Sequence, residues 1–150
     1  MLSTLTSLMK SLFDDKPTAP AAQPELAMAC LLTEVAGADH DISEQEQLSK
    51  KALLTKLTGA DEMQVDDWLV QANQHVDNSA SLFDFTSQLR ELSAEQRYQV
   101  IESMWQVANA DGHIDPLEDA VIRKTAELLY VDHSQFIRAK LSVVDDQPKP

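Results

Sequence analysis

The sequence predicts an all-α fold, a single-domain helical bundle of about seven helices built from two pseudo-symmetric helix–loop–helix–turn–helix halves. Three observations support this prediction. Only 3 of the 150 residues are glycine, which is low for a turn-rich β domain. No segment alternates apolar and polar residues with the period of two that a half-buried strand requires. Apolar residues instead recur at spacings of three and four, and side chains that can cap a helix precede most of these runs.

The chain begins with a short amphipathic segment and a linker. Apolar residues recur at helical spacing over residues 2–13, and three prolines without apolar periodicity follow over residues 14–24. We therefore expect an N-terminal amphipathic helix and Pro-rich linker over residues 1–24, a helical domain over residues 25–145 and a disordered tail over residues 146–150.

Capping boxes predict where the later helices begin. In such a box the N-cap side chain accepts a hydrogen bond from the backbone three residues on, where Glu or Gln bonds back to the N-cap. Together with the apolar spacing, the boxes predict helices over residues 25–37, 43–58, 61–77, 80–91, 93–110, 115–129 and 132–142, of which 80–91 joins the two halves. The five candidate boxes are Ser43 with Glu46, Asp61 with Gln64, Ser93 with Gln96, Asp115 with Glu118, and Asp132 with Gln135.

The charge of the chain limits its partners. It has 25 acidic and 12 basic residues, a net charge of −13, so phosphate backbones repel it and nucleic-acid binding is not expected. Cations and partner proteins are favoured instead. The single cysteine, Cys30, lies in the apolar run 26–32, which predicts a buried structural thiol and not a nucleophile.

No membrane-spanning segment is expected. No apolar run reaches the roughly 18 residues that a span requires, and the N-terminus lacks the features of a signal peptide, so we expect a cytoplasmic protein. Residues 2–13 leave room for peripheral contact with a membrane. Because Lys10 and Lys16 are offset by Asp14 and Asp15, docking on the domain or contact with a partner is favoured over lipid.

One acidic motif occurs twice. GADHDISEQE at residues 37–46 and NADGHIDPLE at residues 109–118 share Ala-Asp, two residues, Ile, three residues and Glu, at a separation of 72 positions. The second copy resembles the later part of a calcium-binding EF-hand loop, with Gly112 and Glu118 at its sixth and twelfth positions. The leading Asp of such a loop is replaced by Val107, and by Val35 in the first copy, so one loop supplies too few oxygens for calcium.

Most of the motif has a structural interpretation. Ser43 and Asp115 cap helices, and Glu46 and Glu118 complete the boxes. Asp39 and Asp111 have no capping role, although a turn inside the loop could employ them. If the halves pack about a twofold axis, these two carboxylates would face each other with other acidic side chains nearby. The candidate ligands for Ca²⁺, Mg²⁺ or Mn²⁺ are then Asp39, Asp41, Glu46, Asp111, Asp115 and Glu118.

Two histidines lie in the same loops. His40 and His113 could join a transition-metal site with the neighbouring aspartates, but a solvated role in the loop is favoured for both.

The repeated motif, the helical pattern and the length resemble the TerB-like family of tellurite-resistance proteins, over roughly residues 26–143. The chain is also similar to the N-terminal region of membrane-anchored DnaJ-like co-chaperones. The resemblance implies a helical bundle with pseudo-symmetric halves, in a bacterial cytoplasmic protein that chelates metal or acts as a stress-response adaptor, with a place near the inner membrane as an alternative. The family's acidic motif carries over onto Asp39, Ile42 and Glu46, and onto Asp111, Ile114 and Glu118.

Two departures limit what the resemblance implies. His40 replaces the glycine expected after the first Asp, so the two halves are not expected to bind metal equally. No His-Pro-Asp signature of a J-domain is present, so the co-chaperone activity does not transfer.

We therefore predict a non-enzymatic acidic helical module for stress tolerance that binds a divalent cation or a partner protein through paired acidic loops. No Ser–His–Asp, Cys–His or glycine-rich arrangement indicates catalysis. The alternative is a metal-dependent hydrolase with carboxylates from both loops.

Overall fold

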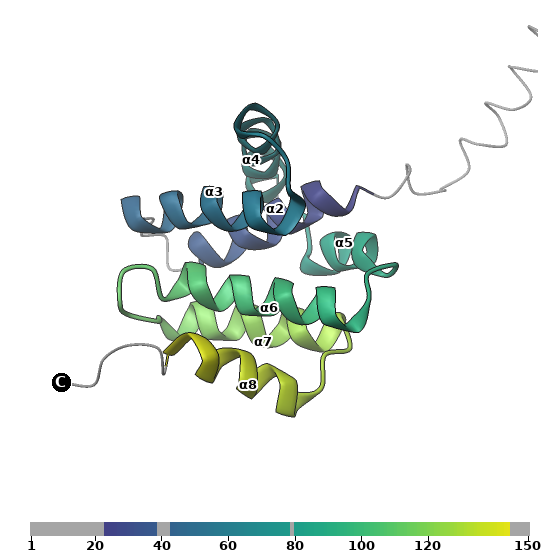
Figure 1. The fold of residues 1–150 in the computed structure, drawn as a ribbon, viewed down its shortest axis with the longest axis vertical. Helices are drawn as coiled ribbons and strands as arrows, with labels where there is room; N and C mark the ends of the chain where they lie inside the picture. The colour runs from purple at the N-terminus through teal and green to yellow at the C-terminus, as the bar shows by residue number, and fades with distance from the viewer. Residues whose placement is uncertain (1–22, 39–42, 79, 145–150) are drawn as a thin grey trace, which may run out of the picture.

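Seven α-helices and one short 3-10 helix make up residues 23–38, 43–78 and 80–144, which are the residues that the computed structural model describes (Figure 1). These ranges contain no strand, and the all-α prediction is confirmed. The expected N-terminal helix, most of its linker and the C-terminal tail lie outside the described residues. The helices are α2 (Pro24–Ala36), α3 (Glu44–Thr58), α4 (Glu62–Asp77), α5 (Leu82–Thr86), η1 (Ser87–Leu89), α6 (Ala94–Ala108), α7 (Pro116–Leu128) and α8 (His133–Val144).

The helices form two halves with matching contacts. In the first half α2 packs on α3 and α4, and in the second half α6 packs on α7 and α8. The halves meet where α2 packs on α6, and each of these central helices also touches the second helix of the other half. Figure 1 shows α2 and α6 in the middle of the bundle, with α7 and α8 below them and α4 at the upper edge. The duplicated arrangement predicted from the repeat is therefore present.

Four of the five predicted N-cap side chains cap their helices, and two of these four form the full box. Full capping boxes are formed by Ser93 with Gln96 and by Asp115 with Glu118. At the starts of α3 and α4, the N-cap side chains accept hydrogen bonds from the backbone of Glu46 and Gln64. At the start of α8 it is the backbone carbonyl of Asp132, not its side chain, that accepts from Phe136.

The helix expected over residues 80–91 is shorter than predicted. An unpredicted capping box between Ser81 and Asp84 starts α5, which ends at Thr86 and continues as the 3-10 helix η1. The hydroxyls of Thr86 and Ser87 donate to the carbonyls of Phe83 and Asp84, three residues earlier. Such local bonds compete with the α-helical pattern, which explains why the prediction placed the end of this helix too late.

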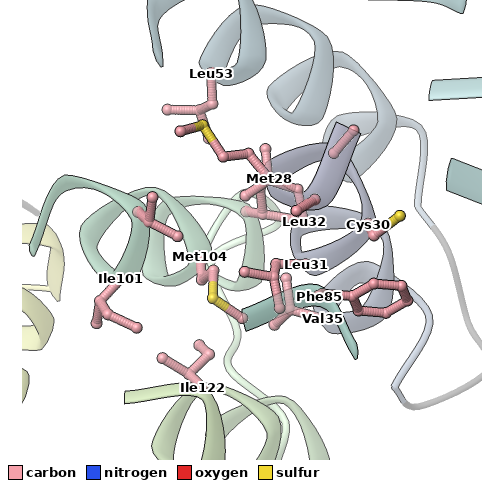
Figure 2. Close-up of a cluster of buried hydrophobic side chains, with 14 of the residues drawn as sticks. Met28, Cys30, Leu31, Leu32, Val35, Leu53, Phe85, Ile101, Met104 and Ile122 are labelled. Carbon is pink, nitrogen blue, oxygen red and sulfur yellow. The ribbon is translucent and has the colours of Figure 1, made fainter. Parts of the chain in front are cut away.

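The core forms around α2. Ten of its thirteen residues are buried, as expected of a helix that packs on its neighbours all round. Figure 2 shows its Leu31 and Val35 close to Met104 of α6, with Ile122 of α7 below. Apolar side chains of both halves thus share one cluster.

Cys30 is buried, as predicted. Burial, with a smaller contribution from Glu34, raises the pKa of the thiol to about 12. The thiol is therefore protonated and unreactive at neutral pH.

Candidate functional site

The first copy of the acidic motif is described only at its end. Asp39, His40, Asp41 and Ile42 lie outside the described residues. Ser43 accepts a hydrogen bond from the Glu46 backbone at 3.1 Å and donates one to Glu46 Oε1 at 3.2 Å. The Glu46 carboxylate is thus held at the start of α3, and this residue is only 1% exposed.

The second copy is described in full, and its loop depends on Asp111 and Gly112. The Asp111 carboxylate accepts a hydrogen bond from the His113 backbone N–H at 3.0 Å. Gly112 follows with φ of 84°, a left-handed conformation that glycine adopts without strain. Asp111 therefore stabilises a turn within the loop and does not cap a helix. Its side chain is exposed, so it also faces solvent.

Asp115 and Glu118 start α7. Glu118 Oε1 accepts from the Asp115 backbone at 2.7 Å, and Asp115 Oδ1 accepts from the Leu117 backbone at 2.8 Å. Glu118 is 2% exposed, almost as deeply buried as Glu46 in the first half. The predicted capping roles of both residues are confirmed.

The described part of the motif contains no metal site by itself. No group of three or more His, Cys, Asp or Glu side chains that could hold a metal ion is found within residues 23–38, 43–78 and 80–144. Asp115 and Glu118 come together through the capping box, whereas Asp111 lies in the exposed loop before them. Any site that includes Asp39 or Asp41 extends beyond these ranges.

The acidic starts of α3 and α7 lie at one end of the bundle. In Figure 1, α2 and α6 both run toward the left and end there, and α3 and α7 begin there. Because α3 packs on α6 and α7 packs on α2, the two helix starts flank the same central pair. Negative charge from both halves is therefore concentrated at this end.

Sequence reasoning missed a buried lysine beside this end. Lys50 is 1% exposed, and its Nζ donates to Thr33 Oγ1 at 3.4 Å. Burial lowers the pKa of Lys50, and the nearby charge of Glu46 opposes this effect. The repeat contained a usable signal, because Lys50 aligns with the core residue Ile122 at the same separation of 72 positions.

Comparison with known proteins identifies the family. The family model described as Tellurite resistance protein TerB matches residues 25–141. The chain belongs to the TerB family. This confirms the resemblance seen in the repeated motif, the helical pattern and the length, and TerB is not known as an enzyme family. No helix in the described part of this TerB-family chain is long and apolar enough to cross a membrane.

The TerB-family fold is also found in a crystal structure of a protein of unknown function from Porphyromonas gingivalis W83. The two structures superpose with a TM-score of 0.60 at 18% sequence identity, covering 85% of this chain and 98% of the other. At this identity the likeness shows the fold alone. Comparison with curated proteins gives no significant match.

Proposed function

We propose that this TerB-family protein is a non-enzymatic, cytoplasmic acidic module for stress tolerance that binds a divalent cation or a partner protein through its two acidic loops. The supporting observation is the position of Asp111. It is exposed at the acidic end of the bundle, and only its Oδ1 accepts a hydrogen bond from the described residues. The other oxygen remains available to a cation or a basic side chain. The proposed ligands are Asp39, Asp41 and Glu46 from one half and Asp111, Asp115 and Glu118 from the other.

Electrostatics supports a weak, oxygen-based site. Carboxylates crowded on a chain with a net charge of −13 repel each other, and a cation relieves this repulsion. A cation that binds only the folded state stabilises it by about 1.4 kcal/mol when its concentration is roughly ten times its dissociation constant. A site with a dissociation constant of about 1 mM would therefore be visible in a thermal melt at about 10 mM cation.

A partner protein would use the same charges. A basic surface would find carboxylates of both halves at one end of the bundle, and salt would weaken its association. We expect cations that occupy the loops to compete with such a partner.

The experiment compares wild type with Asp39→Asn/Asp111→Asn in EDTA and in millimolar Ca²⁺, Mg²⁺ or Mn²⁺. We expect at least one cation to raise the melting temperature of wild type, because it neutralises the carboxylates. The variant should melt higher than wild type in EDTA, because two repelling charges are gone, and should not respond to cations. Asp67→Asn/Asp77→Asn on α4 removes the same charge elsewhere and should keep the response. A wild-type protein that ignores every cation would contradict the cation form of the proposal.

The alternative of a metal-dependent hydrolase is tested separately. The same protein, saturated with each cation, is assayed against phosphomonoester, phosphodiester and nucleic-acid substrates. We expect binding without turnover. Hydrolysis that Asp111→Asn abolishes would overturn the non-enzymatic proposal in favour of the alternative.

A further inference from the structure

The turn between α7 and α8 contains a strained, exposed aromatic residue. Tyr130 has φ of 58°, in the left-handed region, and it is 87% exposed. The corresponding turn of the first half, between α3 and α4, has Gly59 at φ of 71°. A residue with a side chain is strained in this conformation, and an exposed ring recovers little packing energy. The fold requires the left-handed turn, but it does not require tyrosine.

Tyr130 lines a surface groove of about 420 Å³ between α5, the start of α6 and the end of α7. This is the right-hand end of the bundle in Figure 1. Phe83 on its wall is 55% exposed and Leu128 of α7 is partly exposed, whereas Leu89 of η1 is buried. We call it the Arg97 groove, defined by Phe83, Leu89, Arg90, Arg97, Leu129 and Tyr130.

Among the described residues, neither arginine of the Arg97 groove has an acidic partner. Arg97 donates to the carbonyl of Arg90 at 2.6 Å and to that of Leu129 at 3.4 Å, while its buried Nε has no acceptor among the described residues. The Arg90 guanidinium lies 6.0 Å from the ring centre of Phe83. Within the described ranges neither arginine forms an ion pair, although acidic residues outnumber basic ones by 25 to 12. Neither guanidinium charge is therefore neutralised by a carboxylate of the described residues.

The charged side chains that line the Arg97 groove are mostly basic, whereas those of a neighbouring hollow are balanced. A second hollow of about 500 Å³ shares Arg97 and Tyr130 and adds Arg138, but Glu95 and Asp132 also line it and offset its arginines. Among the described residues that line the Arg97 groove, one is acidic, Glu127, and two are arginines. An occupant with carboxylates beside apolar side chains fits this combination.

The chain itself supplies such a segment next to the groove. The backbone N–H of Gln23 donates to Gln88 Oε1 at 3.1 Å, and Gln88 belongs to η1, which also forms a wall of the groove. Gln23, which follows residues 1–22, therefore lies against η1; Gln23 and Gln88 themselves line another hollow, which shares α5 and η1 with the Arg97 groove. Residues 1–22 include the sequence Leu-Phe-Asp-Asp at 12–15. Residues 16–22 span up to about 23 Å when extended, more than the roughly 10 Å width of a helix.

We propose that the Arg97 groove is the docking site of residues 12–15 of this chain's own N-terminal segment. Leu12 and Phe13 cover the apolar wall that exposes Phe83 and Tyr130. Asp14 and Asp15 bring two carboxylates to Arg90 and Arg97. This contact lies away from the acidic loops and does not depend on metal binding.

The test uses the full-length protein with a nitroxide spin label at Ser11→Cys. The buried Cys30, with its thiol pKa of about 12, stays unlabelled at neutral pH. We expect the label to broaden the backbone amide signals of Phe83, Arg90 and Tyr130 in NMR spectra, because the label is then next to the groove. Asp14→Arg/Asp15→Arg should abolish the broadening, and adding Arg90→Asp should restore part of it. Lys56→Asp makes the same change of charge at an exposed site outside the groove and should restore none.

Three results would overturn the proposal. The groove signals could stay sharp, or the label could instead broaden Gln71 and His75, which line the hollow on the other side of α5. Broadening could persist after the charge reversal, which would remove the role of the arginines. The third result comes from a mixture of two chains, one that carries the spin label without ¹⁵N and one that carries ¹⁵N without the spin label. Broadening in this mixture would identify a second copy as the occupant, and docking within one chain would be wrong.

Discussion

Lys50 and Ile122 occupy the same position in the two halves of the bundle, four residues after a buried glutamate, and both side chains are buried. Ile122 contributes to the core as an apolar side chain normally does. Lys50 brings an ammonium group into the interior, where Thr33 accepts its hydrogen bond. The duplicated halves therefore differ in charge at the position next to the acidic end.

The lowered pKa of Lys50 predicts a pH effect. The folded protein releases this proton at a lower pH than the unfolded chain, whose lysine pKa is near 10.5. Between these values the unfolded state binds more protons, so the Lys50 contribution to stability rises with pH and levels off above 10.5. We expect the stability of wild type relative to Lys50→Met to increase between pH 7 and 10.5, measured by urea unfolding. A difference that is constant with pH would mean that burial does not perturb this lysine.

Glu118→Ala should destabilise the fold whether or not metal is present. The substitution leaves the Asp115 backbone N–H without its acceptor and empties a buried position, at a cost of about 1 to 2 kcal/mol. Glu118→Gln retains an acceptor oxygen and should lose less. Denaturant unfolding in EDTA and in millimolar Mg²⁺ measures both. Unchanged stability in EDTA together with a lost cation response would show that this residue serves binding and not capping.

The two left-handed turns give a matched pair of substitutions. Tyr130→Gly should raise the free energy of unfolding by about 0.5 to 1 kcal/mol, because relief of left-handed strain exceeds the added chain entropy of glycine. Gly59→Ala should lower it by about 1 kcal/mol through strain alone, since its Cβ would meet no atom within 4 Å. Both are measured in the Asp14→Arg/Asp15→Arg background, which removes the proposed docking. Loss of stability in Tyr130→Gly would assign the ring a packing role in the fold.

The raised pKa of Cys30 makes the protein less stable in alkali. Its thiol ionises near pH 9.0 in the unfolded chain and at about 12 in the folded one, so the folded state binds more protons between these values. Stability should therefore fall with rising pH in this window, by up to about 1.4 kcal/mol per pH unit, and Cys30→Ala should remove this part of the slope. At pH 8 the native thiol should react with a disulfide reagent only as fast as the protein unfolds. Rapid labelling of native protein would contradict the burial.

Much of the fold could be predicted because its signals are local. Capping side chains and apolar spacing act within a few residues, so the starts of α3, α6 and α7 were predicted to within one residue. The repeat of the acidic motif added the division into halves. The prediction for residues 80–91 was wrong for a local reason as well. The hydroxyls of Thr86 and Ser87 favour the 3-10 helix η1, but they leave the apolar spacing unchanged, so the spacing still predicts a longer α-helix.

The remaining features depend on which distant segments meet. The spacing of apolar residues places Lys50 on a helix face, but it does not predict that neighbouring helices bury this side chain. The burial of Lys50 depends on the packing of α2 against α3. The Arg97 groove likewise combines α5 and the start of α6 with the end of α7, which lies far from both in the sequence. Local propensities decide where helices begin and end, since their interactions span a single turn. Buried charge and surface grooves are decided only when the helices pack, because desolvation and ion pairing depend on neighbours that the order of residues does not reveal.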